Sequence, residues 1–171
     1  MLVNLTDIFT SEEKNAAMEV SLEMNEVTFG NETFPICEKN PVVLSLQNEG
    51  INKAVVHAVT KVVAIFQCDR CLKDVKQTFD LDFEVRVNSP ELQEETEEQS
   101  FMNGYHLDVD DLIYNEMILN WPMKILCRED CKGICRVCGK DLNTGTCECD
   151  TFVPNPGLAG IKEIFNANKE V

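Results

Sequence analysis

Eight of the nine cysteines in this 171-residue chain fall into two groups of four, and no other feature constrains the fold as strongly. The cysteines of the first group are Cys68, Cys71, Cys127 and Cys131. Those of the second group are Cys135, Cys138, Cys147 and Cys149. A tetrahedral Zn²⁺ ion binds four thiolates at about 2.3 Å, and a C-x-x-C turn supplies two of them at once. The spacing therefore predicts two zinc ions per chain.

The second group is compact, because its four cysteines lie within 15 residues of one another. Gly139 follows its C-x-x-C motif and permits a tight turn in which backbone N–H groups point at the sulfurs. Asn143 and Gly145 predict a second turn that returns the last two cysteines to the same place. Cysteines can also act as small buried hydrophobic residues, but residues 135–149 are too polar to form a core.

The first group is split, because 56 residues separate Cys71 from Cys127. A four-cysteine site here requires two distant segments to meet. Alternatively, Cys127, Cys131 and Cys135 are spaced by four and could line one face of a helix, although Gly133 and the preceding Pro122 disfavour a helix. If the split site forms, it fixes the C-terminal third to the rest of the chain, since structural zinc contributes ~10–16 kcal/mol in peptides at neutral pH.

A zinc ion with four protein thiolates has no open position for water or substrate, so we expect a structural metal and a protein that is not an enzyme. The alternative is a thiol redox protein that uses Cys68 and Cys71, with Arg70 lowering the pKa of a thiol. No βαβ pattern surrounds this motif, which disfavours a thioredoxin-like fold. The ninth cysteine, Cys37, has no predicted partner, and we expect it to be a small buried residue.

Strict alternation of apolar and polar residues from Val75 to Val87 predicts a strand with one buried face. The β-branched segment from Ala54 to Phe66 predicts a second strand. Together they form a long hairpin over about 54–88, with the first C-x-x-C motif at its tip. Shorter strands are expected at Met18–Met24, Glu26–Phe29 and Val42–Gln47, separated by Asn and Gly turns and by Pro35 and Pro41.

Two short helices are expected, at about 109–120 and 156–166. Asp108 or Asp110 can cap the first helix, which follows an acidic loop at 91–100. The predicted class is α+β: an antiparallel β-rich body with two helices and a C-terminal zinc-binding cysteine module. The body takes residues 1–122, the module 123–152, and the last helix, in 153–171, packs back on the body to give one integrated domain.

The formal net charge of −15 predicts basic partners and repels nucleic acid over most of the surface. Residues 124–140 are the exception, because this segment contains five basic and two acidic residues. Our candidates for RNA contact are Lys124, Arg128, Lys132, Arg136 and Lys140. No apolar run is long enough to span a membrane and the first residues do not resemble a secretory signal, which predicts a cytoplasmic protein with no membrane partner. No phosphate-binding glycine loop is present, so no small-molecule substrate is expected.

Four segments of the chain form a recognisable pattern: Leu119–Lys124, the cysteine-rich run Cys127–Asn143, Cys68–Cys71 and Asn155-Pro156. Together these segments resemble the YceD family, the domain of unknown function 177. The resemblance covers most of residues 50–168, whereas the first 50 residues match only in their strand-rich character.

The resemblance implies a bacterial or organellar protein that is required for normal accumulation of large-subunit ribosomal RNA and is commonly encoded beside a large-subunit ribosomal protein. An acidic body with a basic cysteine segment suits an assembly factor that binds large-subunit ribosomal RNA or a precursor particle, and with it a basic ribosomal protein. A third alternative uses only the acidic surface. In this alternative the protein is a chaperone that binds a basic ribosomal protein and does not itself contact RNA.

Overall fold

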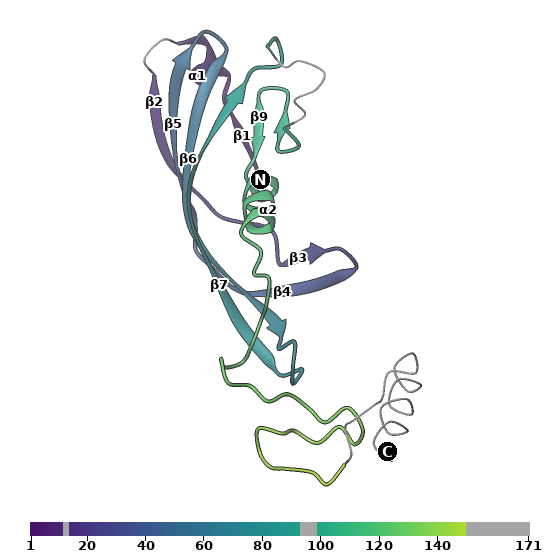
Figure 1. Cartoon of the computed structure of the whole chain (residues 1–171). Coiled ribbons are helices and arrows are strands. Elements are labelled where there is room, and N and C mark those ends of the chain that lie inside the picture. Colours follow the sequence, from purple (N-terminus) through teal and green to yellow (C-terminus); the bar gives the residue numbers. More distant parts are fainter. Residues whose placement is uncertain (12–13, 93–98, 150–171) are drawn as a thin grey trace, which may run out of the picture.

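The computed structural model describes residues 1–11, 14–92 and 99–149. They form a long, twisted six-stranded antiparallel sheet, a small three-stranded antiparallel sheet, a helix that packs on the long sheet, and a cysteine-rich segment at one end (Figure 1). Its elements are β1 Leu2–Asn4, α1 Thr6–Thr10, β2 Asn15–Val20, β3 Glu26–Phe29, β4 Glu32–Lys39, β5 Val42–Gly50, β6 Lys53–Gln67, β7 Asp74–Asn88, β8 Met102–Asn103, β9 His106–Asp108 and α2 Val109–Leu119. The prediction of an antiparallel, β-rich body with helices is confirmed. No helix among these residues is long and apolar enough to cross a membrane.

Strands β6 and β7 form the hairpin around which the sheet is built. They pair without interruption from Lys53 opposite Asn88 to Gln67 opposite Asp74. On β7 the odd-numbered residues face inward, and the most buried of them are Phe79, Leu81 and Val87. The period-two pattern predicted this strand correctly, because one face of β7 packs against the core while the other face contacts water.

The second edge of β6 is shared by two strands, which divides the sheet into two arms. Strand β5 pairs with the first half of β6, and β4 pairs with the second half. In Figure 1 the β3–β4 hairpin accordingly diverges from β2 and β5. The sequence does not predict strand β4, because Pro35 favours a break between strands. Pro35 has no N–H to donate, and the pairing with β6 begins one residue later, at Ile36.

The prediction for Cys37 is wrong, because its side chain is exposed. Phe34 and Ile36 on the same strand are partly buried against the core, so alternation places Cys37 on the opposite face. The register with β6 shifts at this point, and the Cys37 thiol donates a hydrogen bond to the Val63 carbonyl at 3.4 Å.

Helix α2 packs on the sheet through Leu112, Ile113 and Met117. Asp108 is its N-cap, accepting a hydrogen bond from the backbone N–H of Asp110. The Asp110 carboxylate instead accepts two backbone N–H groups of the β2–β3 connection, at 2.8 and 2.9 Å. Helix α1 was not predicted, whereas the predicted helix at 156–166 and most of the acidic loop lie outside the described residues.

Trp121 holds the chain against the sheet immediately after α2. Its indole stacks on Phe29, with ring centroids 4.7 Å apart, and meets Phe66 edge-on at 5.1 Å. Stacked and edge-to-face arrangements are the favoured geometries of aromatic pairs, so these contacts fix the orientation of the indole. The segment that leaves α2 is thereby directed toward the tip of the β6–β7 hairpin, where the cysteines lie (Figure 1).

Candidate metal centres

The fold brings both predicted groups of cysteines together. Within each group the four sulfur atoms lie within 4.8 Å of one another. The first cluster consists of Cys68, Cys71, Cys127 and Cys131, and the second of Cys135, Cys138, Cys147 and Cys149. Residues 121–149 contain no helix, so the alternative of cysteines lining a helix face is not observed.

The sulfur spacing in the first cluster fits a tetrahedral metal. Four ligands at about 2.3 Å from a central zinc ion lie about 3.8 Å from each other. The Cys68 and Cys131 sulfurs are 3.8 Å apart, and those of Cys71 and Cys127 are 3.5 Å apart. The cluster therefore has the donor set and the dimensions of a closed four-thiolate site.

Both C-x-x-C motifs form the same turn. The backbone N–H of Leu72 donates to the Cys68 carbonyl at 2.9 Å, and that of Gly139 donates to the Cys135 carbonyl at 2.8 Å. In each turn the carbonyl of the lysine two residues after the second cysteine accepts a 2.8 Å hydrogen bond from the N–H of the first cysteine. Leu72 and Gly139 both have left-handed backbones, with φ of 59° and 72°. The two turns do not look equivalent in the sequence, because the first has Leu72 at the position where the second has Gly139.

We expect Leu72→Gly to stabilise the protein by up to about 1 kcal/mol, because glycine removes the left-handed strain that a Cβ atom causes. The Leu72 side chain is exposed, so little packing is lost. Chemical denaturation at fixed zinc concentration measures the change. Val137→Gly is the matched control, since Val137 is an exposed apolar residue in the second turn with no positive φ. A loss of stability in both variants would contradict the assignment of strain to Leu72.

Backbone N–H groups stabilise thiolate in the first cluster. Burial alone would raise the pKa of the Cys68 thiol, but the N–H groups of Cys127, Arg70 and Cys71 lower this pKa to about 6. Hydrogen bonding to Cys71, together with burial, raises the pKa of Cys127 to about 12. Four thiols this close oppose each other's ionisation, whereas a divalent cation between them would favour the thiolate form of all four.

The second cluster has the same electrostatic pattern. The N–H groups of Cys138 and Val137 lower the pKa of the Cys135 thiol to about 6. The Val137 N–H lies 3.4 Å from the Cys135 sulfur, as expected for a turn whose amides point at a metal ligand. The neighbouring Cys138 raises the pKa of Cys149 to about 12. Both clusters could hold metal ions on the chemistry of their donors.

Backbone hydrogen bonds dock the cysteine-rich segment onto the hairpin tip. The N–H of Asp69 donates to the Ile125 carbonyl at 2.9 Å, and the Asp69 carboxylate accepts the Ile125 N–H at 2.8 Å. The Arg70 carbonyl accepts the N–H of Ile134 at 3.0 Å, while its guanidinium donates to the Cys131 carbonyl. Arg70 therefore bonds a carbonyl that belongs to the opposite half of the cluster.

Gly133 and Asn143 are two residues of this site that the sequence analysis missed. Gly133 has φ +79°, and a Cβ atom there would lie 2.8 Å from the Arg70 carbonyl oxygen. Asn143 donates to the Cys131 sulfur at 3.5 Å and accepts the Lys132 N–H at 2.8 Å, so it holds the backbone beside a ligand of the first cluster. The sequence indicated a turn at Asn143 and no helix at Gly133, but it did not indicate their contacts with Cys131 and Arg70, which are distant in sequence.

An ion pair ties the second cluster's segment to the hairpin. Lys73, two residues after the first C-x-x-C motif, lies 2.6 Å from the Asp141 carboxylate. The hydrogen bond from Lys73, helped by the N–H of Asn143, lowers the pKa of Asp141 to about 2. Asp141 is therefore ionised whenever the protein is near neutral pH.

The five basic candidates are all exposed, but they differ in their partners. Arg128 pairs with Asp130 at 3.3 Å and donates to the Asn143 side chain, and Lys140 donates to the Thr146 carbonyl. Within the described part of the chain, the other three side chains make neither an ion pair nor a hydrogen bond. These three are Lys124, Lys132 and Arg136.

A protein-family model described as large ribosomal RNA subunit accumulation protein YceD matches residues 56–165, which is more than half of the chain. The matched range contains all of α2, all eight clustered cysteines and most of the β6–β7 hairpin. No curated protein and no solved structure matches the chain significantly.

Proposed function

Because this chain belongs to the YceD family of large ribosomal RNA subunit accumulation proteins, we propose that it acts as a non-enzymatic assembly factor containing two structural zinc ions. The observation that carries this proposal is the pair of four-thiol clusters, which lies inside the matched residues. The proposed compartment is the cytoplasm, where thiols stay reduced and available to metal.

In this proposal each cluster holds one zinc ion through its four thiolates. A zinc ion held in this way stabilises structure and leaves no position for water or substrate. The first ion would join the β-rich body to the cysteine module of residues 123–152, because its ligands come from the hairpin tip and from the segment after α2. The second ion would order the module itself.

Large-subunit ribosomal RNA, free or in a precursor particle, is the proposed partner of the basic face of this module. Lys124, Lys132 and Arg136 support this assignment, because they are exposed and their charges are not paired within the described residues. So few phosphate contacts give a modest affinity that falls as salt concentration rises. Such a contact suits a factor that binds and leaves during assembly.

Charge reversal tests the RNA contact. Lys132→Glu with Arg136→Glu is expected to release the protein from large-subunit precursors on density gradients at low salt. Binding to purified ribosomal RNA should lose about two units of salt slope, one for each phosphate contact removed.

The matched control is Lys53→Glu with Lys61→Glu, which changes the net charge equally at exposed positions on β6. Equal release by both pairs would show that overall charge, and no local surface, drives the association. If the Lys132 and Arg136 variant still sedimented with large-subunit precursors, the basic face of the module would not be the RNA-binding surface.

The net charge of −15 favours a second candidate function, an acidic chaperone that binds a basic ribosomal protein without contacting RNA. Co-purification after ribonuclease treatment distinguishes the two functions. A complex between proteins survives the nuclease, whereas an association through RNA is lost.

A further inference from the structure

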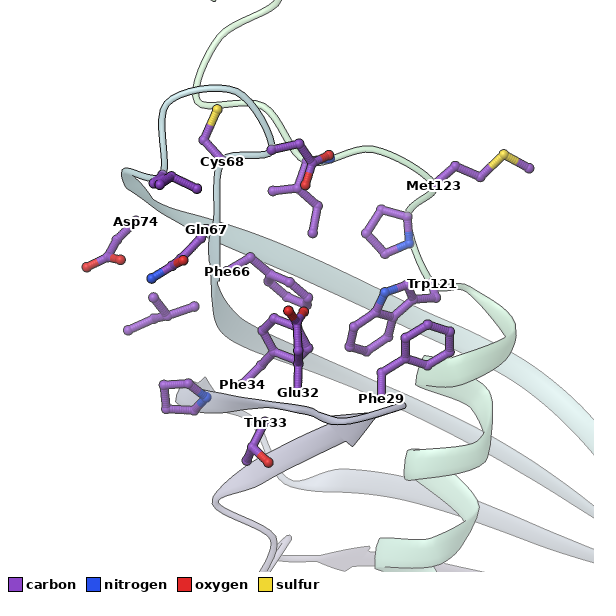
Figure 2. Close-up of a pocket in the computed structure, with 16 residues that line it drawn as sticks. Phe29, Glu32, Thr33, Phe34, Phe66, Gln67, Cys68, Asp74, Trp121 and Met123 are labelled. Atoms are coloured by element: carbon purple, nitrogen blue, oxygen red, sulfur yellow. The ribbon is translucent and has the colours of Figure 1, made fainter. Parts of the chain in front are cut away.

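A groove with a cavity volume of about 1050 Å³ lies between the β3–β4 hairpin, the tip of β6–β7 and the residues after α2 (Figure 2). Its floor is aromatic: Phe34 stacks on Phe66 with centroids 4.5 Å apart, and Trp121 lies against Phe29 and Phe66. Phe29 keeps 45% of its surface exposed. Phe66 is buried at the bottom of the groove, Phe34 and Trp121 are partly buried above the core, and Phe29 carries the aromatic floor to the surface.

The rim of the groove carries further exposed apolar side chains. Leu72 is 59% exposed at the hairpin tip, and Met123 is fully exposed after α2. Figure 2 shows the Met123 side chain extending away from the rings at the edge of the groove. Apolar side chains gathered around a hollow of this kind mark a binding surface more often than isolated exposed residues do.

The charge in the groove is of one sign. Its sixteen lining residues include three carboxylates, Glu32, Asp69 and Asp74, and no lysine, arginine or histidine. Asp69 accepts the Ile125 N–H, but Glu32 and Asp74 have no ion-pair partner among the described residues. Figure 2 shows Glu32 among the side chains that line the groove together with the aromatic rings. Ring faces and carboxylates both attract cations.

We propose that this groove binds a basic, extended segment of a protein partner. A lysine or arginine of that segment lies over the ring of Trp121 or Phe29 and pairs with Glu32, while Asp74 binds a second cation. Apolar side chains of the same segment cover Leu72 and Met123. The inference deepens the proposed function, on which it rests for the expectation of a basic protein partner, by locating the surface that binds it.

The same observations disfavour RNA as the occupant. Bases could stack on Phe29 and Trp121, but the phosphates that follow would lie beside unpaired carboxylates, with no cation in the groove to offset the repulsion. Nucleic acid is instead expected at Lys132 and Arg136, outside the groove.

Fluorescence of Trp121 reports occupancy directly, because it is the only tryptophan in the chain. The full-length protein is titrated with a short peptide of alternating arginine and leucine, with the same peptide carrying glutamate for arginine, and with a short uridine oligonucleotide. Only the basic peptide is expected to shift the Trp121 emission saturably. A shift caused equally by the acidic peptide, or by the RNA, would overturn the proposal.

Glu32→Gln with Asp74→Asn should weaken binding of the basic peptide about tenfold or more, because both local charges are lost. Glu19→Gln with Glu84→Gln is the control: it changes the net charge equally at exposed residues on β2 and β7 and should weaken binding less than about twofold. Equal weakening would show diffuse attraction to an acidic protein and overturn the proposal.

Two further measurements separate this inference from its alternatives. Leu158→Glu with Phe165→Glu alters the C-terminal segment, which lies outside the described residues. If these substitutions alone changed the Trp121 emission, the groove would hold the chain's own segment and the proposal would fail. Lys132→Glu with Arg136→Glu should leave peptide binding intact, so a failure of the RNA contact is distinguishable from a failure of the groove.

Discussion

Cys68→Ser is expected to lower the zinc content from two ions per chain to one and to release the cysteine module from the hairpin tip. Structural zinc contributes ~10–16 kcal/mol in peptides at neutral pH. Each backbone hydrogen bond between the module and residues 69 and 70 contributes only about 0.5–1.5 kcal/mol, so these bonds alone hold the module weakly. Metal analysis gives the stoichiometry, and limited proteolysis after residue 121 reports the release.

Cys37→Ser is the matched control, because Cys37 is exposed on β4 and belongs to neither cluster. This variant should keep two ions and remain resistant to the protease. Cys135→Ser should also lose one ion, but its module should stay attached at the hairpin through the first site. If Cys68→Ser retained two ions, the first cluster would not be a zinc site.

The sheet was predictable where the pattern of side chains is local. Strands β6 and β7 each carry 15 residues, long enough for period-two alternation to appear clearly on β7. Strand β4 was missed because proline normally ends a strand. The pairing with β6 begins at Ile36, so the missing N–H of Pro35 removes no hydrogen bond from that ladder. Cys37 was misplaced for a related reason: its face depends on a strand that the sequence did not reveal.

The sequence predicted which cysteines form each cluster, but it did not predict the contacts that bring the two segments of the first cluster together. Spacing grouped the eight cysteines, because a C-x-x-C turn places two sulfurs together by local geometry. The contacts that join the two halves of the first cluster are long-range and leave no local signal. Gly133 approaches Arg70 across 63 residues of sequence, and Asn143 contacts Cys131 only because the module folds back.

The two proposed partner surfaces are neighbours at one end of the molecule. Cys68 and Asp69 line the aromatic groove and also belong to the hairpin tip on which the cysteine module docks. A basic protein segment in the groove would neutralise carboxylates close to the surface proposed for RNA, which lowers the repulsion felt by phosphates. If both proposed surfaces are occupied together, the protein segment and the RNA would bind with positive cooperativity.

Gly133→Ala is expected to destabilise the attachment of the module by about 3 kcal/mol. The left-handed backbone alone disfavours a Cβ atom by about 1–2 kcal/mol. The added carbon would also lie 2.8 Å from the Arg70 carbonyl oxygen, a backbone atom that cannot rotate away, so the adjacent hydrogen bond from Ile134 would lengthen or break. Competition with a chromophoric chelator should show faster loss of one zinc ion, and hydrogen exchange should show loss of protection at Ile134.

Gly139→Ala separates the two contributions. Gly139 has nearly the same backbone angle, with φ +72°, but a Cβ atom there would meet nothing within 4 Å. This variant therefore carries only the backbone penalty of about 1–2 kcal/mol and, as a ligand turn of the second cluster, should affect the second ion. The excess loss in Gly133→Ala measures the close approach between module and hairpin. Equal losses in the two variants would mean that Gly133 and Arg70 do not hold the module in place.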